Sequence, residues 1–226
     1  MSTWISRPLI VAALLAGLAG CVTTGTPEAG RSASPFGAAV TGAAPARAAA
    51  VMGGAVKIAG PEGFCVDRAS SRIGGAAPFV LLAPCERIRS GVAGLILRPR
   101  VLLTATVTEG PGPTDSGYLR FFSEPEGLAA LSATGNGAGL EVERMETAAD
   151  GSFRVTVTED AAPDRAGMVD GRSWRAFFAV NGHLVAASLR SPREAPMSAE
   201  RAAALLDGFV AAIRAASTPA DRPAQG

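Results

Sequence analysis

Short hydrophobic runs separated by turn-forming residues predict β-strands in the first half of the chain. Residues 101–108 are rich in β-branched side chains and lie between Arg-Pro-Arg and Gly-Pro-Gly-Pro, which is typical of a strand between two turns. Residues 78–83 form a continuous apolar run, which indicates burial on both faces. Shorter strands are predicted at 55–59 and 64–66.

Apolar and turn-forming residues predict a hairpin over residues 173–190. Asn181-Gly182 is the preferred pair for a two-residue type I′ turn. This closure places Phe178 opposite Val185, so that two large apolar side chains meet across the strands.

A second hairpin joins strands predicted at 140–147 and 152–159. A two-residue turn between them would place apolar residues opposite polar ones. A three-residue loop with Gly151 at a positive φ angle instead pairs Val155 with Met145, so the longer loop is predicted.

Two segments carry the end signals of helices. The first spans 123–133, with Pro125 in the first turn, where its missing N–H costs little. Ser123 is the predicted N-cap, and Glu126 completes a capping box. The second helix spans 198–216 and begins at an N-cap serine. Its apolar stripe consists of Ala202, Leu205, Leu206, Phe209, Val210 and Ile213.

The order of these elements predicts an α+β fold, in which an antiparallel sheet carries two packed helices. The predicted domain covers residues 55–216. Residues 21–54 are rich in Thr, Gly, Pro, Ala and Ser without a sustained period, and are predicted to be a disordered, flexible tether. Residues 217–226 are predicted to be a disordered tail.

The order of elements in 101–216 resembles the MOG1/PsbP-like fold, in which helices sandwich a sheet. The hairpin at Asn181-Gly182 and the closing helix carry this resemblance. The segment from Gly63 through Cys85 is similar to uncharacterised alphaproteobacterial lipoproteins. Neither resemblance implies an activity, because one fold hosts many functions.

The first 20 residues have the pattern of an export signal. Their apolar run, residues 9–20, would span roughly 18 Å as a helix, which is too short for a hydrocarbon core of about 30 Å. Residues 1–20 are therefore predicted to be a cleaved signal peptide. At its end, Leu18-Ala19-Gly20-Cys21 resembles the lipobox of bacterial lipoproteins.

The lipobox resemblance implies cleavage after Gly20 and attachment of diacylglycerol and an N-acyl chain, such as palmitate, to Cys21. Several acyl chains hold a protein on a bilayer, whereas one gives marginal binding. Because Val22 stands where an Asp would favour the inner membrane, the resemblance favours the outer membrane, facing the periplasm. The alternative is an ordinary secretory signal followed by an incidental cysteine.

Composition and charge narrow the possible classes of protein. The chain has 226 residues, is 48% hydrophobic and has a formal net charge of +1, with a mean hydropathy of +0.25. These values exclude a wholly disordered chain. They also exclude a nucleic-acid partner recruited by bulk charge, because 21 basic residues face 20 acidic ones.

If Cys21 carries the lipid, two of the three cysteines remain to be assigned a role. The remaining pair, Cys65 and Cys85, is predicted to form a disulfide in an oxidising compartment. A reactive thiol or a metal site is the alternative. No Cys-x-x-Cys motif is present, and the sequence has a single histidine to complete a soft-ligand set. No metal and no cofactor is therefore predicted.

The sequence offers no recognisable catalytic set, so the protein is predicted not to be an enzyme. His183, the single histidine, directly follows a hairpin turn and is expected to be solvated. Glu141, Glu143 and Glu146 lie on one predicted strand, but their spacing matches no known cation site. Glu141 and Glu143 share one face of that strand, which is expected to be solvated.

Three aromatic residues are candidates for a ligand-binding groove between helix and sheet. Tyr118 and Phe121 belong to an aromatic cluster that precedes the first helix, and Trp174 lies in the second-half hairpin. The alternative is that the cluster is a core strand or a helix-entry staple and that Trp174 belongs to the core.

These observations predict a non-enzymatic lipoprotein of the cell envelope that acts as a binding or assembly accessory. Its expected partners are the membrane, through the lipid anchor, and an envelope protein or peptidoglycan. A carrier or sensor with a small-molecule pocket between sheet and helices is the alternative. A hydrolase with an unrecognised site is the third hypothesis.

Overall fold

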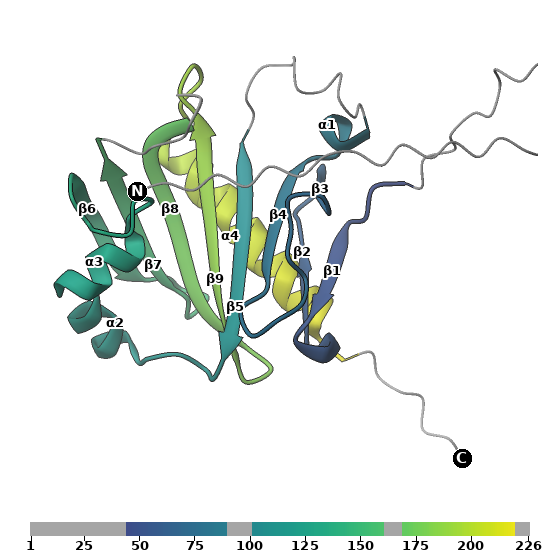
Figure 1. The fold of residues 1–226 in the computed structure, drawn as a ribbon, viewed down its shortest axis with the longest axis horizontal. Helices are drawn as coiled ribbons and strands as arrows, with labels where there is room; N and C mark the ends of the chain where they lie inside the picture. Colours follow the sequence, from purple (N-terminus) through teal and green to yellow (C-terminus); the bar gives the residue numbers. More distant parts are fainter. Residues whose placement is uncertain (1–43, 90–100, 161–168, 220–226) are drawn as a thin grey trace, which may run out of the picture. The chain divides into compact units, whose positions relative to one another are not determined.

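A seven-stranded antiparallel sheet forms the centre of the computed structural model, which describes residues 44–89, 101–160 and 169–219. Its spatial order is β3-β4-β5-β9-β8-β7-β6 (Figure 1). The strands are β3 (Phe64–Val66), β4 (Phe79–Pro84), β5 (Leu102–Glu109), β6 (Leu140–Thr147), β7 (Phe153–Glu159), β8 (Val169–Val180) and β9 (His183–Pro192). The predicted α+β class is confirmed.

A separate two-stranded sheet precedes the main one. It pairs β1 (Ala48–Val51) with β2 (Val56–Ala59), and the short 3₁₀ turn η1 (Met52–Gly54) connects them. The predicted tether, 21–54, is therefore wrong from residue 48 onward. Alanine carries little hydrophobic signal, but Ala49 is buried opposite Ile58. Residues 1–43, which include the predicted signal peptide, Cys21 and most of the predicted tether, lie outside the described residues, as do residues 220–226 of the predicted tail.

The hairpin between β8 and β9 has the predicted register. Phe178 faces Val185, and two residues, Asn181 and Gly182, close the turn at φ angles of 49° and 79°. Both angles are positive, as a type I′ turn requires.

The hairpin between β6 and β7 is also as predicted. Val155 faces Met145, and Gly151 has a φ angle of 74°. The strands meet again where the N–H of Ala148 donates to the carbonyl oxygen of Ser152, which leaves a three-residue loop. A register shift between Val142 and Arg144 marks a β-bulge in β6.

Helix α4 (Ala199–Ser217) covers one face of the main sheet. It begins as predicted, with the Ser198 hydroxyl accepting a hydrogen bond from the N–H of Arg201. It packs against β2, β8 and β9, and Figure 1 shows it crossing behind the strands. Its buried apolar residues are those of the predicted stripe except Leu205, which is partly buried.

Charged residues of the β6–β7 loop and of β7 fix α4 to the sheet. Arg154 lies 3.0 Å from both Asp150 and Asp207, and Arg214 lies 3.5 Å from Asp150. Burial alone would raise the pKa of Asp150. Hydrogen bonds from Ser152 and the charges of the two arginines outweigh it and hold that pKa below its ordinary value.

Helices α2 (Asp115–Phe121) and α3 (Pro125–Leu131) pack on the other face of the sheet. Alternation along β8 places Trp174 and Phe178 in the cluster with α4, whereas Phe177 packs against the cluster of α2, α3 and β7. The buried members of this second cluster are Tyr118, Phe122, Leu131, Phe153, Val155 and Val157.

The predicted capping box at Ser123 is wrong. Helix α3 has Glu124 at the N-cap without a side-chain hydrogen bond, and the Ser123 hydroxyl instead donates to the carbonyl oxygen of Leu119. The cause is α2, which the sequence did not predict and which ends at Phe121, two residues before Ser123. Thr114 caps α2 by accepting from the N–H of Gly117 at 3.3 Å.

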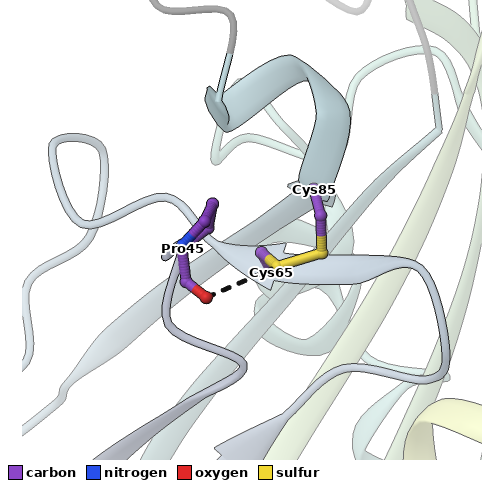
Figure 2. The surroundings of a disulfide bond; sticks show 3 residues. All are labelled: Pro45, Cys65 and Cys85. Carbon is purple, nitrogen blue, oxygen red and sulfur yellow. Dashed lines mark hydrogen bonds between the residues drawn. A yellow bond between two sulfur atoms is a disulfide. The ribbon is translucent and has the colours of Figure 1, made fainter. Parts of the chain in front are cut away.

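Cys65 and Cys85, the predicted pair, form a disulfide between β3 and the first residue of α1 (Cys85–Arg89) (Figure 2). Their Cα atoms lie 4.8 Å apart, and the bond closes a separation of 20 residues. The carbonyl oxygen of Pro45 lies 3.8 Å from the sulfur of Cys65. Because an oxidised cysteine has no S–H, this is a packing contact, and it places the bond against the segment leading into β1.

Because α4 is buried against the sheet, shortening phenylalanine to alanine should change the free energy of unfolding much more on α4 than at an exposed position. Phe209→Ala removes a fully buried side chain and is expected to lower the free energy of unfolding by about 3–5 kcal/mol. Phe121→Ala, at 39% exposure, is expected to cost about 1 kcal/mol or less. Urea denaturation of both variants measures this difference, and equal losses would contradict the assigned core.

The disulfide is expected to stabilise the fold by about 3 kcal/mol, because it restricts the unfolded chain. Cys65→Ser combined with Cys85→Ser should lower the urea midpoint accordingly. Intact mass after alkylation checks the bond itself, since prior reduction should add two alkyl groups to this pair. Equal masses with and without reduction would show that the bond is absent.

Candidate functional site

The three aromatic candidates do not form one groove. Tyr118 is buried against Phe153, with ring centroids 4.9 Å apart, and burial together with the charge of Asp115 raises the pKa of its hydroxyl. Phe121 is exposed on α2, whereas Trp174 is buried in the cluster beneath α4, on the other face of the sheet. Tyr118 and Trp174 therefore belong to the core, although Tyr118 lies on helix α2 and not on the strand that the alternative assumed.

The titratable residues considered in the sequence analysis do not come together in one site. His183 is half-buried rather than solvated, and its Nδ1 has no hydrogen-bond partner among the described residues. Glu143 is paired with Arg172, whose hydrogen bond lowers the pKa of that carboxyl group. In the described part of the chain, no group of three His, Cys, Asp or Glu side chains could hold a metal ion.

Three charged residues, Glu159, Arg175 and Arg190, form a polar centre on the face of the sheet that α2 and α3 cover. Glu159 is a buried residue that the sequence analysis did not single out. Glu159, at the end of β7, is 2% exposed. Its carboxylate accepts hydrogen bonds from the Ser132 hydroxyl and, at 3.0 Å, from the N–H of Ala133. Burial raises the pKa of Glu159, but these hydrogen bonds and the charge of Arg190 outweigh it and leave the pKa below its ordinary value.

Arg175 lies in the middle of β8, on the same face as Glu159. Its terminal nitrogens donate to the carbonyl oxygens of Ala130 and Leu131, the last turn of α3, where a cation complements the helix dipole. Its Nε is buried and has no partner among the described residues. Burial, with repulsion from Arg190, lowers the pKa of Arg175 to about 10, so it stays charged at neutral pH.

The sheet register gathers polar side chains from three strands beside Arg175. Ser188 on β9 lies directly opposite Arg175, and Thr104 on β5 lies directly opposite Ser188. Arg190 follows Ser188 by two residues and so shares its face. These four residues and Leu102 line an open hollow of about 280 Å³.

Two further hollows lie between α4 and the sheet, on the face of Trp174. One of about 180 Å³ is bordered by Arg154 and Asp207, which are paired with each other. The other, of about 500 Å³, is bordered by Glu143 and Arg172, which are also paired. In each of these two hollows, the named arginine is thus paired with a carboxylate at 3.0 Å or less, whereas Arg190 lies 3.9 Å from Glu159.

The residues of this polar centre are far apart in the sequence, so spacing could not reveal them. One local signal was present. Arg175 interrupts the otherwise apolar stretch 174–180, directly after Trp174, at a position that alternation places on a helix-covered face. A charged residue at such a position calls for a buried partner or a ligand.

Comparison with known proteins gives one distant structural similarity. No protein-family model matches the chain, and no curated protein matches it significantly. The X-ray structure of an uncharacterised protein from Mycobacterium smegmatis, the Rv0999 ortholog, is similar with a TM-score of 0.29 and 14% sequence identity. The match covers 68% of this chain and 78% of that one.

One structural feature bears on the cellular compartment. The Cys65–Cys85 disulfide indicates an oxidising, extracytoplasmic location. Among the helices in the described ranges, none is long and apolar enough to cross a membrane.

Because the pKa of Glu159 lies below its ordinary value, we expect this carboxylate to stabilise the fold at neutral pH and to lose that effect in acid. A carboxyl group whose pKa is lower in the folded than in the unfolded state stabilises the fold above its unfolded pKa and loses this effect as pH falls. Glu159→Gln should therefore lower the free energy of unfolding by about 1–3 kcal/mol at neutral pH. The loss should shrink between about pH 5 and pH 3.

Urea denaturation across this pH range measures the effect of Glu159→Gln. Glu141→Gln, on the exposed strand β6, is the matched control and should leave stability nearly unchanged. A pH-independent loss for Glu159→Gln would show that the charge of Glu159 contributes nothing.

Proposed function

We propose that this protein is a membrane-anchored periplasmic lipoprotein, placed at the outer membrane by lipid on Cys21, that acts as a non-enzymatic binding or assembly accessory of the cell envelope. The lipobox at 18–21 and the extracytoplasmic character of the disulfide support export. The tether between the anchor and β1 gives the domain reach from the membrane surface.

The open hollow beside Arg175 is the observation that supports a binding role. It is bordered by guanidinium and hydroxyl groups, which recognise ligands through hydrogen bonds. The nearby carboxylate of Glu159 is held by donors and has a lowered pKa, whereas a general base works best with a pKa near the ambient pH. This chemistry favours recognition over proton transfer.

A carrier or sensor of small molecules is the second candidate. The groove of about 500 Å³ between α4 and strands β6–β8 supports it, because binding sites for small ligands have volumes of this order. An envelope protein or peptidoglycan is the proposed partner for the accessory role, and recruitment to the membrane would be through the lipid.

The lipid anchor is tested by Cys21→Ser. This variant should lose metabolic palmitate labelling and leave the membrane fraction, because no other acylated residue is proposed. The matched control carries serine at Cys65 and Cys85, and should keep both label and location. Retention of the label by Cys21→Ser would overturn the assignment.

The accessory role is tested by crosslinking in cells. The lipidated protein should yield a reproducible envelope partner that Cys21→Ser, which leaves the membrane, recovers at much lower yield. Turnover of a substrate by the purified protein, abolished by His183→Ala, would instead establish an enzyme.

A further inference from the structure

We infer that the hollow between Arg175 and Arg190 binds a phosphate group, carried by a small ligand or a lipid headgroup. The inference rests on the binding role proposed above and names its ligand chemistry. Its structural basis is the placement of two guanidinium and two hydroxyl groups on one face of three adjacent strands.

The register of the sheet is enough to bring these donors together, because all four residues lie on strands. Arg175, Ser188 and Thr104 form one row across β8, β9 and β5, and Arg190 lies one pleat further along β9. Side chains of such diagonal neighbours approach within about 7–8 Å at their Cβ atoms. Long arginine side chains can therefore contact one small anion together.

The local charge balance favours an anion. Two arginines face one carboxylate, Glu159, and that carboxylate already accepts hydrogen bonds from Ser132 and Ala133. Its nearest approach to Arg190 is 3.9 Å, longer than a hydrogen bond. The repulsion between Arg175 and Arg190 is thus incompletely compensated by Glu159, and a bound anion would relieve it.

A phosphate fits this donor set better than a carboxylate. The fork of Arg190 can bind phosphate oxygens through paired, charge-assisted hydrogen bonds. Arg175 offers its Nε–H, because its terminal nitrogens already donate to α3. The hydroxyls of Ser188 and Thr104 can donate to further oxygens. The tetrahedral oxygens of a phosphate point in several directions toward donors on three strands, whereas the acceptor sites of a carboxylate lie in one plane and carry less charge. The hollow, at about 280 Å³, holds a phosphate and a small adjoining group.

The test uses the full chain in detergent, with binding followed by calorimetry and by the NMR signals of arginine Nε–H groups at constant ionic strength. Inorganic phosphate and soluble dihexanoyl phosphatidic acid are the two probes, and acetate is the comparison. Binding of either phosphate probe at millimolar concentration, with a shift of Arg175 Nε–H, supports the site. A response to one probe alone identifies the source as free phosphate or lipid.

Arg190→Gln should weaken phosphate binding about tenfold or more, because it removes a charge-assisted pair of donors. Arg190→Lys should weaken it less, since the charge remains. Arg144→Gln, on the exposed strand β6 and with 67% of its side chain accessible, is the matched control and should change affinity less than about twofold. Arg190→Lys also keeps the test valid if the glutamine variant folds poorly.

Three outcomes would overturn the inference: no response to either phosphate probe, acetate binding as tightly as phosphate, or equal effects of Arg190→Gln and Arg144→Gln. Failure here is separable from failure of the proposed function. A chain that ignores phosphate but still crosslinks to an envelope partner keeps its accessory role. A chain that binds phosphate but lacks lipid on Cys21 keeps the site and loses the anchor.

Discussion

The packing of α4 against the sheet is the interaction on which the other features depend. Directly opposed alanines, Ala105, Ala187 and Ala176, cross three strands in the buried cluster, and their small size leaves volume for large helix residues such as Phe209. Because side chains alternate along a strand, a slip of one residue would turn Arg175 toward α4 and expose the apolar row. The contact that stabilises the apolar face therefore also holds the polar face in place.

Local sequence signals were sufficient to predict the elements whose structure is determined by residues close together in the sequence. The type I′ turn, the register around Gly151 and the stripe of α4 depend on neighbours in the sequence, and all three were predicted correctly. Strand β1 depends instead on β2 and on burial, and its alanines gave too little signal. At Ser123 a local signal was misleading, because α2 already used that hydroxyl.

The polar centre shows why the candidate site could not be found in the same way. Glu159, Arg175 and Arg190 come from three strands, and only the sheet register makes them neighbours. Gly171 contributes to this arrangement, since a Cβ atom there would lie 2.6 Å from the carbonyl oxygen of Glu159. Because glycine has no Cβ atom, β8 can approach the end of β7 at this position. In the sequence, the local signal for the site was Arg175, a charged residue within the otherwise apolar stretch 174–180.

The two edges of the sheet have a consequence for self-association. An unpaired strand edge is a template for edge-to-edge aggregation, and this risk grows with strand length and flatness. Here β3 has three residues and is crosslinked at its middle residue, Cys65, while β6 is bulged and carries Glu141, Glu143, Arg144 and Glu146. Both edges are thus poor templates for a second copy, so edge-to-edge pairing between copies of this chain is disfavoured even at high concentration.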